Sequence, residues 1–233
     1  MDETKEASME SNRAVSISRL IAIPALITLA VTILRLVGEL KHWSPTLFNT
    51  HPGGGGALVG ISWLPIIFGP YFALKLARAG DGPASNGKAI GFAFVSLVVF
   101  AAGVAFFALS VNHPNFFTVL GLLLMLAAAF VPGIAWRSLG NTLVAYAFAA
   151  RIPVMILMYF AITGNGGAGW GTHYDAMPPA LLSASPLRKF FFGGVLPQMM
   201  LWIGFTAVVG SIFGTIVAAV AHRKKPVSPA AVS

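Results

Sequence analysis

The stretch GNTLVAYAFAARIPVMILMYFAI, residues 140–162, decides the fold of this chain. It is apolar almost throughout, and its length matches the roughly 20 helical residues that cross a bilayer core of about 30 Å. The apolar residues run on without the alternation of polar and apolar residues that a barrel strand requires. We therefore interpret the stretch as a membrane-spanning helix, with Arg151 near its middle.

Other apolar segments of comparable length occur on both sides of this stretch. Together they predict an all-α fold, that of a polytopic integral membrane protein with six transmembrane helices. Proline residues inside these segments are expected to kink the helices. Polar tails, residues 1–17 and a basic disordered 222–233, flank the membrane domain, residues 18–221. The predicted spans lie near residues 18–40, 57–77, 89–110, 116–136, 140–162 and 197–221.

The composition of the chain excludes a soluble globular domain. Of its 233 residues 57% are hydrophobic and 9% are charged, whereas soluble domains carry about 25% charged residues. Cysteine is absent, which excludes disulfides and thiolate metal sites. The net charge is +8, but the basic residues mostly flank apolar segments. We therefore expect the lipid bilayer, and not nucleic acid, to be their partner.

Basic residues are distributed unevenly between the two predicted sides of the membrane. One side carries ten of them, and the other carries Lys41, Arg188 and Lys189, with Arg35 near a span end. The positive-inside rule then predicts that both termini are cytoplasmic. Short loops favour a bacterial inner membrane as the location. The ten basic residues are Lys5, Arg13, Arg19, Lys75, Arg78, Lys88, Arg137, Arg223, Lys224 and Lys225.

Arg151 is the residue most indicative of function. An arginine at the centre of a span costs at least about 2.5–3.5 kcal/mol and is expected to face the bundle interior or a water-filled cavity. Alternatively, the helix kinks at Pro153 and the side chain extends to the cytoplasmic interface. A guanidinium without a carboxylate partner suits an anionic ligand, such as a lipid phosphate or a substrate carboxylate.

Few acidic residues are available to neutralise Arg151. On the predicted outer half of the membrane only Glu39 and Asp175 occur. Arg35 and Glu39 are four residues apart, so they share one helix face and can pair with each other, either as an interfacial anchor or as part of a site. The candidate ligand-binding residues are therefore Arg151, Arg35, Glu39 and Asp175.

Histidines in the predicted outer loops offer a second kind of site. His113 and His173 are candidate metal ligands, and Asp175 lies two residues after His173. Against this, no pair of histidines has a recognised metal-binding spacing. The Gly-rich stretches 53–56 and 164–171 lack the Walker A and dinucleotide patterns, and are either flexible loops or segments that approach a ligand closely.

Three functional hypotheses follow. In the leading one the protein is not an enzyme, and it binds or transports an anionic or amphiphilic small molecule in a cavity that contains Arg151. In the second it is a membrane-embedded redox or metal enzyme that uses His113, His173 and Asp175. In the third it is a structural subunit of a larger complex or a homo-oligomer. The sequence identifies neither a cofactor nor a substrate.

Overall fold

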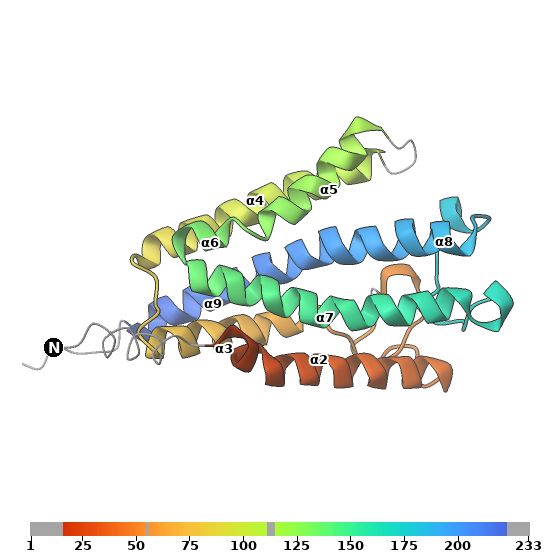
Figure 1. Cartoon of the computed structure of the whole chain (residues 1–233), viewed down its shortest axis with the longest axis horizontal. Coiled ribbons are helices and arrows are strands. Elements are labelled where there is room, and N and C mark those ends of the chain that lie inside the picture. The colour runs from red at the N-terminus through yellow and green to blue at the C-terminus, as the bar shows by residue number, and fades with distance from the viewer. Residues whose placement is uncertain (1–15, 55, 111–114, 223–233) are drawn as a thin grey trace, which may run out of the picture.

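Every regular element is a helix in the part of the chain that the structure describes, residues 16–54, 56–110 and 115–222 (Figure 1). The structure is a computed structural model. The longer helices are α2 (Ile17–Leu40), α3 (Leu64–Arg78), α4 (Asn86–Ser110), α5 (Phe116–Ala128), α7 (Arg137–Thr163) and α9 (Trp202–His222). The shorter elements are η1 (Pro52–Gly54), α6 (Pro132–Ala135), η2 (Asn165–Gly167), η3 (Pro179–Leu181), α8 (Pro186–Lys189), η4 (Phe190–Val195) and η5 (Pro197–Leu201).

Five helical segments are long and apolar enough to cross a membrane, which makes the chain a multi-span membrane protein. They are Ile17–Leu40, Asn86–Ser110, Phe116–Ala135, Arg137–Thr163 and Pro186–Ala221. The last joins α8, η4, η5 and most of α9, and we call it the C-terminal helix. All five coincide with predicted spans, although the C-terminal helix begins well before residue 197.

The remaining predicted span, residues 57–77, is the second along the chain, and its helix is shorter than predicted. The helix α3 begins only at Leu64 and has 15 residues, a length of about 22 Å, which is shorter than the bilayer core. Residues 57–63 instead form irregular backbone. Pro65 occupies the first turn of α3, where its missing N–H is not needed. A helix is therefore present at this position, but irregular backbone replaces its predicted first turns.

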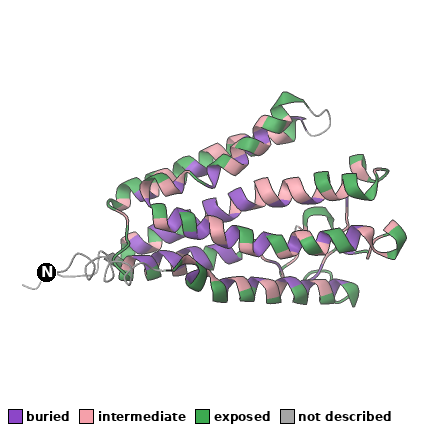
Figure 2. Ribbon diagram, in the orientation of Figure 1, coloured by how far each residue is buried: buried purple, intermediate pink, exposed green. Residues whose placement is uncertain are grey.

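The helices form two groups. One group consists of α2, α3, α7 and the C-terminal helix, in which α3 and α7 each pack against α9, and α2 packs against α7. The other is the α4–α5 hairpin, which packs against α9 and diverges from the C-terminal helix toward the end where α8 lies (Figure 1). Buried residues line the facing sides of the helices, and exposed residues cover the outward sides (Figure 2).

Aromatic packing holds α2, α3 and α7 together. The rings of Phe68 and Phe72 on α3 both meet Tyr146 of α7 edge-on, with ring centroids 5.4 Å apart. The Tyr146 hydroxyl in turn shares a 2.8 Å hydrogen bond with the Thr28 hydroxyl on α2. Because edge-to-face aromatic pairs contribute about 0.5–1.5 kcal/mol each beyond area burial, Tyr146 is a main anchor between these three helices.

Prolines have two roles in the helices. Pro24, Pro70 and Pro153 lie inside α2, α3 and α7, where each removes one backbone hydrogen bond. In contrast, Pro132 and Pro197 stand at the first position of α6 and η5. The Thr28 hydroxyl donates to the Pro24 carbonyl at 2.8 Å, and this hydroxyl–carbonyl bond supports α2 near its interruption.

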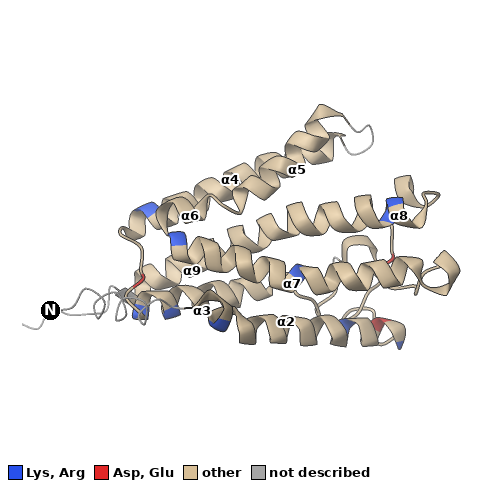
Figure 3. Ribbon diagram, in the orientation of Figure 1, with Lys and Arg blue, Asp and Glu red and all other residues tan. Residues whose placement is uncertain are grey.

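Basic residues gather at one end of the bundle (Figure 3). The helices α2, α4 and α7 begin at this end, and α3 ends there (Figure 1). The basic residues at this end are Arg19, Lys75, Arg78, Lys88 and Arg137. The opposite end carries the loops that follow α2 and α7. We call this opposite end the loop end.

Candidate ligand-binding cavity

A cavity of about 420 Å³ lies in the half of the bundle near the loop end. Its walls come from α2, α7, the C-terminal helix and one residue of α4, and the loops after α2 and α7 close it. The short α3 leaves this space unfilled. The lining includes Arg35, Phe107, Arg151, His173, Gln198 and Trp202. Small-molecule sites in proteins occupy about 300–1,000 Å³, so the cavity has the size of a binding site.

Arg151 projects from α7 into this cavity and is 4% exposed. No acidic side chain lies within ion-pair distance of it among the described residues, because the ion pairs found there involve Glu39 alone. Its Nε atom is buried without a hydrogen-bond partner. The side chain is buried at the cavity and does not extend to an exposed interface, as the alternative interpretation required. Arg151 is therefore a buried cation that lacks a protein counter-ion within the described chain.

The ring of Trp202 supports the guanidinium of Arg151. The Cζ atom of Arg151 lies 4.6 Å from the centroid of the Trp202 ring, within the range of a cation–π contact. Such a contact acts on the positive charge of the guanidinium and is not a conventional hydrogen bond. The contact therefore places the guanidinium beside Trp202 at the cavity wall.

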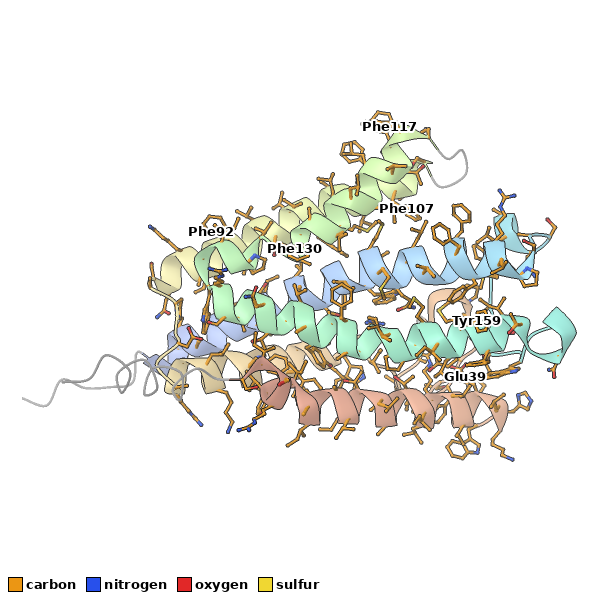
Figure 4. All side chains as sticks on the ribbon, viewed as in Figure 1. Glu39, Phe92, Phe107, Phe117, Phe130 and Tyr159 are labelled. Atoms are coloured by element: carbon orange, nitrogen blue, oxygen red, sulfur yellow. The ribbon has the colours of Figure 1, made fainter. Side chains whose placement is uncertain are left out.

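Arg35 forms the ion pair with Glu39 that the spacing allowed, and His173 joins it. The Arg35 Nε donates to Glu39 Oε1 at 2.7 Å, and Glu39 Oε2 accepts the backbone N–H of His173 at 2.8 Å. The His173 Nδ1 lies 2.6 Å from Glu39 Oε1. Glu39 is 1% exposed, and Figure 4 places it near the end of α2, beside α7. This Arg35–Glu39–His173 cluster ties the loop after α7 to α2.

The surroundings of His173 disfavour the charged form of its ring. Burial lowers the pKa of the imidazole and the charge of Arg35 lowers it further, which outweighs the raising effect of the hydrogen bond to Glu39. A carboxylate only accepts hydrogen bonds, so in the neutral ring Nδ1 carries the hydrogen and its N–H donates a hydrogen bond to Glu39. The other ring nitrogen, Nε2, is then an acceptor on a residue that lines the cavity.

Arg35 also organises the loop after α2. Its Nη2 donates to the carbonyls of Asn49 and Gly54, each at 3.1 Å. Gly54 has a φ of +69°, and a methyl group there would come within 3.1 Å of the guanidinium and 2.9 Å of the His173 ring. Only glycine fits this close approach. Arg35 is thus largely engaged in structure, whereas Arg151 has no ion-pair partner among the described residues.

Asp175 serves the loop that carries it. Its carboxylate accepts the backbone N–H groups of Gly171 and Thr172, each at 2.9 Å, and the Thr172 hydroxyl at 2.6 Å. The Gly-rich stretch wraps around this carboxylate, and Gly169, with a φ of +85°, has no room for a side chain beside it. Asp175 is not among the residues that line the cavity.

The predicted metal ligands are not gathered into a cluster in the described part of the chain. Within it, no three His, Cys, Asp or Glu side chains lie close enough to hold a metal ion. Among the candidates, His173 is bonded to Glu39, and His113 lies outside the described residues. The structure therefore provides no support for the metal hypothesis.

Two cavity residues were not predicted from the sequence. Gln198 and Trp202 lie four residues apart at the start of the last predicted span, and each lines the cavity beside α7. An amide within an otherwise apolar span is costly without a partner. Gln198 could therefore have been identified from the sequence by the same reasoning as Arg151, as a polar residue inside an apolar span. Nothing in the sequence indicated that Trp202 would lie against Arg151.

Comparisons with protein-family models, curated proteins and solved structures found no match for this chain. The function must therefore be inferred from the cavity itself.

Proposed function

We propose that this membrane protein binds the anionic head of a small molecule in the cavity, with Arg151 as the residue that recognises the charge. The observation that carries the proposal is the burial of Arg151 beside an open space without any acidic partner in the described chain. Buried charges in proteins are generally paired. A bound anion would supply the missing partner.

The contact with Trp202 does not remove the need for an anion. A desolvated cation–π contact contributes about 2 kcal/mol, whereas the net cost of a central arginine in a span is about 2.5–3.5 kcal/mol or more. The contact also leaves Nε without a hydrogen bond. A carboxylate or phosphate oxygen in the guanidinium plane would satisfy both the charge and the donors.

Replacement of Arg151 tests the proposal. Native mass spectrometry of the chain, extracted in native lipid particles, should show a bound anionic species on the wild type. We expect Arg151→Gln to fold and to lose at least nine-tenths of this species, because the amide keeps polarity and removes the charge. The matched control is Arg188→Gln, which removes an exposed arginine and should retain the species.

Two outcomes of this experiment would contradict the proposal. One is an Arg151→Gln variant that keeps the same bound species. The other is a wild-type protein that carries no small anion and instead retains other protein chains, which would support the role of a complex subunit. Arg151 would then be a contact for assembly.

We also propose that the basic end of the bundle faces the cytoplasm and that the cavity lies toward the outer side of a bacterial inner membrane. The support is the gathering of basic residues at that end, as the positive-inside rule requires. The chain has no cysteine, so single cysteines report location without interference. In intact cells, a membrane-impermeant maleimide should label Asn165→Cys, at the loop end, and leave Asp81→Cys unlabelled. The reverse labelling pattern would show that the topology is the opposite of the one proposed.

A further inference from the structure

Gln198 is a second buried polar side chain with an unpaired atom. It lies on η5, is 8% exposed and lines the same cavity as Arg151. Its Nε2 donates to the sulfur of Met158 at 3.5 Å, and its Oε1 has no hydrogen-bond partner. A thioether sulfur can only accept, so the sulfur fixes the orientation of the amide. The unpaired atom of Gln198 is therefore an acceptor.

The backbone around Gln198 has an uncommon geometry. Residues Phe190–Val195 and Pro197–Leu201 form π-helical turns, which are rare and occur frequently at functional sites. Pro197 cannot donate a helical hydrogen bond, and its ring would crowd the carbonyl of Gly193 in a regular α-helix. The wider turn relieves this conflict and lies at the cavity wall, which Gly193, Pro197 and Gln198 all line.

Arg151 and Gln198 line the cavity from two neighbouring helices, one to two helical turns apart. Figure 1 shows that α7 and the C-terminal helix run in opposite directions. Gln198 contacts Met158, and Trp202, four residues further on, contacts Arg151. The four residues from Gln198 to Trp202 correspond to roughly one helical turn, and the seven residues from Arg151 to Met158 to roughly two. The cavity wall thus carries a positively charged donor and, one to two turns away, an amide whose oxygen is unpaired.

The charge of the cavity limits the charge of its occupant. Arg35 and Arg151 are the cationic residues in the lining, and Arg35 is paired with Glu39. One positive charge is left over, and a single negative charge neutralises it. A doubly charged head would leave one negative charge uncompensated in an apolar environment, which is costly.

The walls of the cavity reach the lipid-facing surface. Phe192 lines it from the C-terminal helix and is 50% exposed. Phe107 lines it from α4, on the hairpin that diverges from the C-terminal helix (Figure 4). Val154 and Met158 add further apolar wall. Such walls favour an acyl chain that continues from a head group at Arg151 toward the bilayer.

We infer that the cavity takes a single-chain amphiphile with one carboxylate and a hydrogen-bond donor close to it, of the hydroxylated fatty acid class. The carboxylate binds Arg151, and the hydroxyl donates to Gln198. This inference rests on the proposed function, to which it adds the chemical class of the ligand.

Competition between two matched fatty acids tests the inference. The purified full chain is mixed with equal amounts of hexadecanoate and 3-hydroxyhexadecanoate, and native mass spectrometry separates the two complexes by mass. We expect the hydroxylated acid to be bound about 5–10 times more than hexadecanoate, since one hydrogen bond to a buried acceptor contributes about 1 kcal/mol or somewhat more. In Gln198→Met, which keeps the length of the side chain, the two acids should bind equally.

The possible outcomes separate the inference from the proposed function. If Arg151→Gln binds both acids as the wild type does, the proposed function fails. If binding depends on Arg151 but the wild type does not discriminate, or Gln198→Met still discriminates, only the inference is wrong. The comparison in the wild type holds even if Gln198→Met does not fold. Equal binding of the short, water-soluble 3-hydroxybutyrate would overturn the requirement for an acyl chain.

Discussion

Glu39→Ala should destabilise the protein by about 3–5 kcal/mol, because it removes one partner of a buried ion pair and leaves the other charged. Arg35 is 6% exposed and would lose its 2.7 Å bond to Glu39. The His173 ring and its backbone N–H would lose their acceptor as well. We expect a lower melting temperature in detergent and faster proteolysis in the loop after α7, since the cluster ties that loop to α2.

The control for this prediction is Asp81→Ala, which removes an exposed carboxylate and should leave the melting temperature unchanged. A second variant separates loss of charge pairing from loss of packing. In Arg35→Met/Glu39→Leu both charges are replaced by apolar side chains, and buried pairs replaced in this way often recover stability. The double variant should therefore melt above Glu39→Ala. If Glu39→Ala has the same melting temperature as the wild type, the cluster is not buried as described.

Helices were the part of the structure that the sequence predicted well. The boundaries predicted for α2, α4 and α7 lie within three residues of those in the structure, because a long apolar run in a membrane has to satisfy its backbone internally. The same reasoning overestimated α3. There the apolar residues 57–63 are held as a loop, and the carbonyl of nearby Gly54 accepts from Arg35 on another helix. A hydropathy pattern contains no information about such a tertiary partner.

The site was predicted in part. Arg151 was recognisable because its position within a span is costly wherever its neighbours lie. The pairing of Arg35 with Glu39 followed from a spacing of four residues along one helix. By contrast, Glu39 and His173 are 134 residues apart, and the contact exists only because the loop after α7 folds back onto α2. Local patterns cannot specify a contact of that kind.

Small-residue spacing illustrates the same limit. Gly210 and Gly214 are four residues apart and contact α3 at Gly69, as close helix packing in membranes would lead one to expect. Gly87 and Gly91 show the same spacing, yet a methyl group at Gly91 would meet nothing within 4 Å. The motif therefore identifies helices able to approach closely, and the tertiary fold decides which of them do so.

Gly69→Ala is expected to destabilise the protein by about 3 kcal/mol, at the upper end of the range for overpacked cores. A methyl group at Gly69 would overlap the backbone carbonyl of Gly210, and no rotamer change can move a carbonyl out of the way. The helices α3 and α9 would have to separate. Gly91→Ala provides the opposite result, because it fills open space inside α4 and should raise stability by about 0.5–1 kcal/mol. Melting temperatures in one detergent would compare the two variants. Equal values would mean that α3 does not pack on α9 at this point.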